Sequence, residues 1–388
     1  MPQTNDIKTN YKEMLDFYGE FIDLGRDAYN QVKKSWHPPW GKMETSYRYL
    51  KILQQLKNPK TTWATKNETI YEHETLRLLH FPHDRLDPNK RPVLLLPPQA
   101  GHHSNIADYS ITQSLVRVFQ RYGYDTYVCH WLSATKKYRD LGIADYIRLT
   151  DEAVEEIRNH SEFFKIHLMG QCQGGWQAAI YASLYQDKIA SLATAAAPID
   201  VNAAPSPIVE LAQKAPLDYF EMLVGFGNGL MNGRYVLSGF KNMQAEEHYV
   251  NKYYRLWEML QDADEESIQR FIHFENWYRF TQYLPGRFYL ETIKNIFKEN
   301  NLTKPGALVL DGKSVDLRNI NCPVIILAGK KDHITPPAQA FSLKNYISTP
   351  KEDIVEILTE GGHIGTLMGT ESLREDWTAV AEVLNLTI

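Results

Sequence analysis

The stretch Phe164-Lys-Ile-His-Leu-Met-Gly-Gln-Cys172-Gln-Gly-Gly-Trp-Gln-Ala-Ala-Ile-Tyr181 decides the fold. Its apolar first half predicts a buried strand, and its second half predicts a helix. Between them lies a Gly-x-Cys-x-Gly turn, which is typical of a nucleophile placed between a strand and a helix. Side chains at the glycine positions would clash in so tight a turn. The N-terminus of the helix favours a thiolate, so Cys172 is the candidate nucleophile. The alternative is a buried structural cysteine beside two packing glycines.

Short apolar runs alternate with amphipathic helical stretches on both sides of this turn. This alternation predicts βαβ units and a mainly parallel sheet. Residues 205–300 interrupt it with a helical, aromatic-rich segment. We therefore predict an α/β-hydrolase fold, with a mainly parallel central sheet flanked by helices and an inserted helical cap. The predicted N-terminal extension (1–90) is helical, with an edge strand near residues 76–81. The predicted core comprises residues 91–204 and 301–388, and the predicted cap comprises residues 205–300.

Two residues downstream of Cys172 fit the chain order nucleophile, acid, histidine. Asp332 and His363 each follow a predicted strand, where side chains meet at the carboxyl edge of the sheet. His363 would take the thiol proton, and Asp332 would hold the imidazole tautomer. A turn or cap role for Asp332 and a packing role for His363 are the alternatives. His333 is a candidate substrate contact, although a structural role is favoured. The backbone N–H of Gln173 is a candidate oxyanion donor.

The loop 97–104 follows the first strong strand, where this fold supplies its second oxyanion donor. Gln99 and Ala100 are the candidates for that donor. His102 and His103 would either contact the substrate or form a packing pair. In the aromatic 205–300 segment most rings are expected to form the cap's own core, and Trp277 is the residue predicted to line the pocket.

The composition of the chain limits its possible partners and its possible location. The chain has 388 residues, 43% hydrophobic residues and a formal net charge of −5, and its basic residues are scattered. This pattern argues against nucleic acid as a partner. The polar start and the shortness of the longest aliphatic run, Val93–Leu96, predict neither a signal peptide nor a transmembrane segment. Three cysteines without a disulfide spacing favour a reducing, cytoplasmic compartment. No metal-ligand motif occurs, so no metal is predicted.

The sequence resembles the polyhydroxyalkanoate synthase family between about Val93 and Ile364. The resemblance rests on the cysteine elbow and on several later motifs: Asp145-Tyr-Ile147, Asn300-Asn-Leu-Thr-Lys-Pro-Gly306, Val315-Asp-Leu317, Asp332-His-Ile334 and Gly362-His-Ile364. It implies that Cys172 is acylated by a 3-hydroxyacyl-CoA thioester, which is a substrate, so no cofactor is implied. It also implies that His363 is the base and that Asp332 activates a substrate hydroxyl. A homodimer or a partner subunit and an association with storage granules are further implications.

Two stretches also resemble a neighbouring group, the intracellular polyhydroxyalkanoate depolymerases, which use cysteine as well. These are Ala100-Gly-His-His103 and Ala197-Pro-Ile-Asp200. In addition, Tyr278, Phe280 and Gln282 occupy positions that are polar in the synthase motif after Trp277. The alternatives to an acyltransferase are therefore a cysteine hydrolase, either a depolymerase acting on the polymer or a thioesterase, and a non-catalytic granule-binding protein. The acyltransferase is the function we predict.

Overall fold

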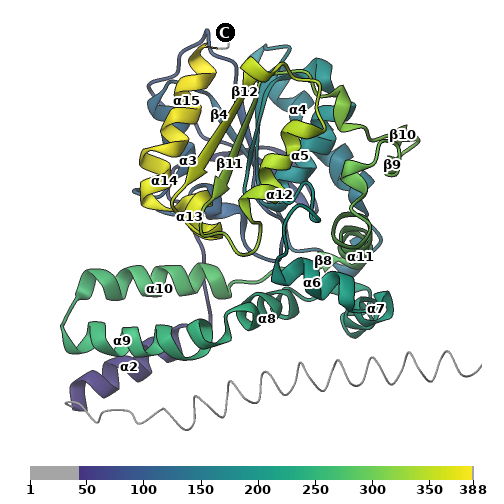
Figure 1. Ribbon diagram of the computed structural model, residues 1–388. Helices are drawn as coiled ribbons and strands as arrows, with labels where there is room; N and C mark the ends of the chain where they lie inside the picture. The colour runs from purple at the N-terminus through teal and green to yellow at the C-terminus, as the bar shows by residue number, and fades with distance from the viewer. Residues whose placement is uncertain (1–42, 387–388) are drawn as a thin grey trace, which may run out of the picture.

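The computed structural model describes residues 43–386, and its centre is an eight-stranded sheet in the order β1-β2-β4-β3-β5-β6-β11-β12 (Figure 1). All pairs from β4 to β12 are parallel, whereas β1 and β2 are antiparallel to their neighbours. The strands are β1 (Glu68–His73), β2 (Leu76–His80), β3 (Val93–Leu96), β4 (Thr126–Trp131), β5 (Ile166–Gln171), β6 (Ile189–Ala195), β11 (Val324–Gly329) and β12 (Ile354–Thr359).

The sheet begins earlier in the chain than predicted. Strand β2 occupies the predicted 76–81 position, but it is not the edge, because β1 pairs outside it. The boundary at residue 91 therefore leaves two strands of the sheet in the predicted extension, for which only one strand was predicted. The predicted helix around Tyr11 and Phe21 lies outside the described residues.

Helices cover both faces of the sheet, and the period-two alternation of each strand decides which core a side chain joins. Leu94 and Leu96 of β3 join the core under α4 (Ile143–Ser161) and α5 (Gln173–Leu184). Val93 and Leu95 join the opposite core, under α3 (Leu115–Arg121) and α15 (Asp376–Leu386). Because both faces are covered, the central strands are buried along their whole length.

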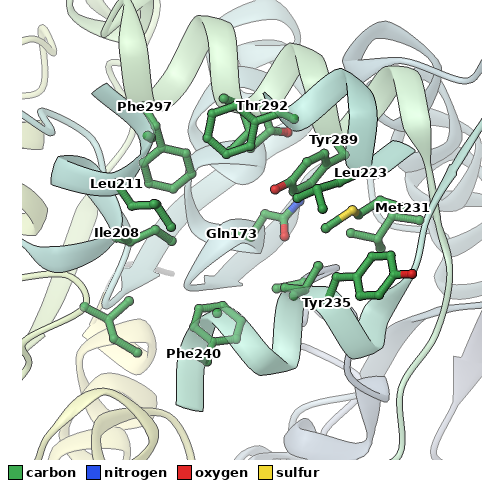
Figure 2. Close-up of a pocket in the computed structure, with 18 of the residues that line it drawn as sticks. Gln173, Ile208, Leu211, Leu223, Met231, Tyr235, Phe240, Tyr289, Thr292 and Phe297 are labelled. Atoms are coloured by element: carbon green, nitrogen blue, oxygen red, sulfur yellow. The ribbon is translucent and has the colours of Figure 1, made fainter. Parts of the chain in front are cut away.

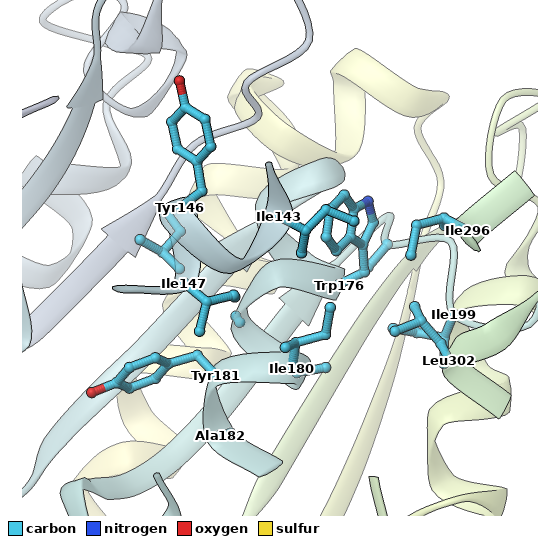
Figure 3. Packing of buried hydrophobic residues seen from close by; sticks show 14 of the residues in the cluster. Ile143, Tyr146, Ile147, Trp176, Ile180, Tyr181, Ala182, Ile199, Ile296 and Leu302 are labelled. Carbon is cyan, nitrogen blue, oxygen red and sulfur yellow. The ribbon is translucent and has the colours of Figure 1, made fainter. Parts of the chain in front are cut away.

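Helix α5 is the centre of the larger core. Eleven of its residues are buried, and Trp176, Ile180 and Tyr181 pack against Tyr146 and Ile147 of α4 (Figure 3). Fully burying one such side chain is worth about 1.5–3 kcal/mol relative to leaving it exposed. This packing holds the helix that follows Cys172 rigidly against the sheet.

The predicted cap interval consists mainly of helices at one end of the sheet, and it also contains the π-helix η4 (Glu247–Asn251) and the short strand pair β7 (Leu230–Met231) and β8 (Leu284–Pro285) (Figure 1). Its other helices are α6 (Pro207–Lys214), α7 (Leu217–Phe226), α8 (Gly233–Met243), α9 (Lys252–Gln261), α10 (Glu265–Arg279), α11 (Gly286–Glu291) and the π-helix η5 (Thr292–Lys298). Helix α2 (Met43–Gln55) packs on α9 and α10 through Tyr49 and Ile52, against Trp257 and Ile272. Helix α2, the first described element of the predicted N-terminal extension, therefore belongs structurally to the cap, whereas β1 and β2 belong to the sheet. Within residues 43–386, no helix is both long enough and apolar enough to cross a bilayer.

Candidate active site

Cys172 sits in a strained turn between β5 and α5. Its backbone has φ +51° and ψ −115°, a conformation that costs an L-residue about 1–3 kcal/mol. Two backbone hydrogen bonds hold it: Cys172 N donates to Ala195 O at 2.7 Å, and Gly175 N donates to Cys172 O at 2.9 Å. The thiol is thereby fixed at the N-terminus of α5, as the sequence motif predicts.

The flanking glycines are required by close backbone approach. A Cβ on Gly170 would lie 2.3 Å from the carbonyl oxygen of Gly174. A Cβ on Gly174 would lie 2.0 Å from the carbonyl oxygen of Leu96 on β3. Both obstacles are backbone atoms, so no rotamer change can relieve the clash. The Gly-x-Cys-x-Gly spacing thus follows from the geometry of the turn.

Asp332 and His363 meet at the carboxyl ends of β11 and β12. His363 Nδ1 lies 2.7 Å from Asp332 Oδ2, and the Asp332 side chain is fully buried. The other oxygen, Oδ1, accepts hydrogen bonds from the backbone N–H groups of Ile334 and Thr335 at 2.9 and 2.8 Å. Strands β11 and β12 are parallel neighbours, which brings the loops that follow them together.

The pKa of His363 reflects this surrounding. Burial lowers it, but the charges of Cys172 and Asp332, and the side-chain hydrogen bonds to both, raise the pKa of His363 well above its ordinary value. Because Nδ1 faces Asp332, Nε2 is the nitrogen that serves Cys172. The imidazole is thus placed beside the thiol as its acid–base partner. The three residues predicted separately from the sequence therefore form one contiguous group.

Cys172 opens into an apolar cavity of about 380 Å³ between the sheet and the cap. Gln173 lies in the middle of the view in Figure 2, between Ile208 and Leu211 on one side and Met231 and Tyr235 on the other. The lining is mostly aliphatic and aromatic, which suits an acyl chain. Sequence reasoning missed these cap residues, because an apolar residue on a helix looks the same whether it faces a core or a cavity.

The two oxyanion candidates from the 97–104 loop are placed differently. Ala100 lines the cavity together with Cys172 and Gln173, whereas Gln99 is buried and does not. Gln173 is the first residue of α5, so its N–H has no acceptor within that helix. Ala100 is thus the better placed of the two loop candidates.

His102, His103 and Trp277 do not reach this cavity, contrary to the predicted lining role of Trp277. The His102 ring packs against both Trp277 and Tyr278, with ring centroids 5.1 and 5.3 Å away. Trp277 Nε1 donates to the carbonyl of His103 at 3.2 Å, and its side chain is buried. Burial lowers the pKa of both histidines to about 4. This arrangement fits a packing role for His102 and His103 rather than contact with the substrate.

His333 also stands outside the cavity lining, although its neighbours Ile334 and Thr335 belong to it. Its Nδ1 lies 3.4 Å from Gln244 Nε2. Burial lowers its pKa, and the charge of Asp332 only partly opposes this. The location agrees with the structural role favoured for it.

One group of side chains in residues 43–386 has metal-ligand chemistry. The ligand atoms of His80, Asp125 and His160 lie within 4.8 Å of one another. Asp125 precedes β4, so the group lies at the amino edge of the parallel strands, opposite Cys172. His80 Nε2 lies 2.8 Å from Asp125 Oδ1, and Tyr127 Oη donates to the other carboxylate oxygen at 2.5 Å. These contacts are those of a hydrogen-bonded network.

The parallel sheet, the strained turn and the order of the three side chains define a protein with the α/β-hydrolase fold. A putative lipase from Sulfolobus solfataricus has the same fold, with a TM-score of 0.51 and 17% identity over 85% of this chain and all of that one. Residues 67–382 match the family described as "Protein of unknown function (DUF3141)", and the chain belongs to that family.

Curated relatives of known name are also similar to the chain in sequence. The poly(3-hydroxyalkanoate) polymerase subunit PhaC of Haloferax mediterranei is 27% identical over 319 residues, covering 82% of this chain and 63% of the relative. The subunit of the same name from Allochromatium vinosum is 27% identical over 326 residues, covering 84% and 89%. The chain thus spans less than two thirds of the first relative and most of the second. It is a polyhydroxyalkanoate synthase-like enzyme of the α/β-hydrolase fold.

Proposed function

We propose that the protein is an acyltransferase that forms an acyl thioester on Cys172 from 3-hydroxyacyl-CoA and transfers the acyl group to a hydroxyl. The observation that carries the proposal is a cysteine, paired with His363, at the wall of a large apolar cavity. The similarity to poly(3-hydroxyalkanoate) polymerases supports it.

In the first half-reaction, His363 takes the proton of the Cys172 thiol, and the thiolate attacks the thioester carbonyl. We assign the oxyanion to the backbone N–H groups of Gln173 and Ala100, because both residues line the cavity together with Cys172. The intermediate collapses with loss of the CoA thiolate, which receives the proton from His363. One thioester replaces another, so the step is nearly isoenergetic.

In the second half-reaction, a substrate hydroxyl attacks the acyl-Cys172 carbonyl. His363 removes the hydroxyl proton, and the Cys172 thiolate leaves as an ester forms. Asp332 either holds the imidazole or contacts the hydroxyl itself. The contacts of Asp332 to His363 and to two backbone N–H groups support the first of these roles.

The hydrolase alternative shares the first half-reaction and differs in the acceptor, which is water. Part of its support came from the loop containing His102 and His103, and these side chains pack away from the cavity. The acyltransferase is therefore the function we favour. A partner subunit or homodimer, a cytoplasmic location and an association with granules remain predictions.

The test is to incubate the full chain with 3-hydroxybutyryl-CoA and with 3-hydroxydecanoyl-CoA and to analyse the acyl products by mass. Cys172→Ala is the blank, and Cys129→Ala is the matched control, because Cys129 is fully buried in the sheet. Oligomeric ester that depends on Cys172 confirms the proposal. Free 3-hydroxy acid alone would mean that water is the acceptor, and product formation by Cys172→Ala would refute the nucleophile.

A further inference from the structure

A second cavity, of about 600 Å³, lies beside helix α8 and is basic. Four cationic side chains line it: Lys57, Arg234, Lys241 and Arg279. The other described residues that line it are neutral, so no carboxylate of residues 43–386 lines it. We call it the basic pocket. It is formed where the segment after α2, helix α8 and the end of α10 come together.

The positive charge of the basic pocket is not balanced by the described residues. Within residues 43–386, Lys57, Arg234 and Lys241 have no carboxylate within ion-pair distance. Arg279 does have one, Glu275, at 2.7 Å, but the same buried carboxylate also binds Lys252 at 2.8 Å. One negative charge therefore serves two cations, and the remaining cations need an anion or water.

Two neighbouring pKa values show the effect of this charge. Burial, together with the charges of Lys252 and Arg279, lowers the pKa of Lys241 to about 8, and the charge of Glu275 opposes this only in part. Burial, followed by the charge of Lys252, lowers the pKa of His248 to about 4. A bound phosphate would oppose both shifts, because it adds negative charge at the same place.

Helix α8 borders both the basic pocket and the apolar cavity at Cys172. Tyr235, Val236 and Gly239 line the apolar cavity, whereas Arg234 and Lys241 line the basic pocket. Ser238 lines both. The helical repeat thus gives α8 one apolar face and one cationic face. A ligand with an apolar chain at one end and phosphates at the other matches this arrangement.

We propose that the basic pocket binds the phosphate groups of the CoA carrier, with Arg234 and Lys241 as principal ligands and Lys57 and Arg279 adding charge. The inference rests on the proposed function, since it is the acyl-CoA donor that supplies these phosphates. CoA carries a diphosphate and a 3′-phosphate, and guanidinium and ammonium groups are the side chains that bind such groups. The pocket would then select CoA thioesters over thioesters of an uncharged carrier.

The experiment measures binding of unacylated CoA to the full-length Cys172→Ala protein by calorimetry, so that it needs no turnover. Arg234→Gln and Lys241→Gln should each weaken CoA binding about 10-fold, the usual size of one lost charge-assisted contact. Added salt should weaken it further. Arg270→Gln is the control, because Arg270 is an exposed cation on α10 that pairs with Glu266 outside the pocket. Circular dichroism checks the fold of each variant, and Arg234→Lys should restore part of the affinity.

Pantetheine, dephospho-CoA and inorganic diphosphate distinguish the sources of the phosphate. The proposal expects pantetheine to bind equally to all variants and dephospho-CoA to bind more weakly than CoA. Diphosphate that binds the pocket without competing with CoA would assign it to free phosphate and overturn the CoA assignment. Equal CoA affinity in every variant would also overturn it. Neither result depends on acyl transfer, so a failure of the proposed function is seen separately, as absence of acylation with any thioester.

Discussion

Replacing Asp332 with asparagine tests the core of the proposed chemistry. The Asp332 carboxylate accepts from three donors, namely His363 Nδ1 and the N–H groups of Ile334 and Thr335. Asparagine has the same shape but only one acceptor oxygen. If that oxygen keeps the two backbone donors, the amide NH₂ faces Nδ1 of His363. The ring must then carry its proton on Nε2, where it cannot accept the proton of Cys172.

The expected loss is large because the wrong tautomer is the stable one. An equivalent replacement in a Ser-His-Asp triad costs about 10⁴-fold, so we expect about 10³- to 10⁴-fold slower acylation of Cys172, equivalent to about 4–5.5 kcal/mol. The pKa of His363 should also fall, since the charge of Asp332 is one of the interactions that raise it.

Two assays on Asp332→Asn check this reasoning. Single-turnover CoA release gives the acylation rate, and alkylation of Cys172 by iodoacetamide across pH reports the thiolate. Glu360→Gln is the control, because this carboxylate is near His363 in sequence but is exposed and paired with Lys330. Acylation within about 3-fold of wild type, with an unchanged alkylation profile, would refute the orienting role. Normal acylation with failed transfer to a hydroxyl would instead assign Asp332 to the substrate hydroxyl.

Three further changes probe the cavity, a distant network and the turn. Leu211→Trp should slow acylation by 3-hydroxydecanoyl-CoA about 10-fold or more and leave 3-hydroxybutyryl-CoA nearly unaffected, measured as CoA release; equal effects on both would contradict an acyl role for the cavity. Burial opposes protonation of His80, but Asp125 and Glu68 raise the pKa of His80 above its ordinary value. The protonated ring therefore stabilises the fold below about pH 6.5, and this stabilisation is lost as pH rises through the raised pKa. Thermal melts of His80→Gln should therefore converge on wild type as pH rises, and parallel curves would speak against this. Gly174→Ala should lower the free energy of unfolding by about 3 kcal/mol in urea, and an unchanged midpoint would show that the backbone can yield.

The three side chains of the candidate site were predictable because each depends on local rules. The glycines around Cys172 are required by backbone contacts within the turn and with β3. Asp332 and His363 follow adjacent parallel strands, whose carboxyl ends must share one edge of the sheet. Sequence order and strand pattern therefore suffice to bring them together.

Other features depend on packing that a single sequence does not reveal. Strand β1 (Glu68–His73) carries mostly polar residues and is partly exposed, so it lacks the apolar run that marks a central strand. Trp277 had the character of a pocket residue, but tertiary contacts with His102 and His103 place it in a core.

The division of roles in the molecule follows from these constraints. Cys172 and His363 are held in position by backbone hydrogen bonds and by Asp332. These contacts do not involve the cap helices. The cavity proposed for the acyl chain, by contrast, is lined largely by residues of α6 to α8 and η5. Helix α8 borders both the apolar cavity and the basic pocket, so a shift of this one helix would alter the sites proposed for the acyl chain and for the phosphates together. Changes of donor specificity should therefore map to α8 while leaving the intrinsic reactivity of the Cys172 thiol intact.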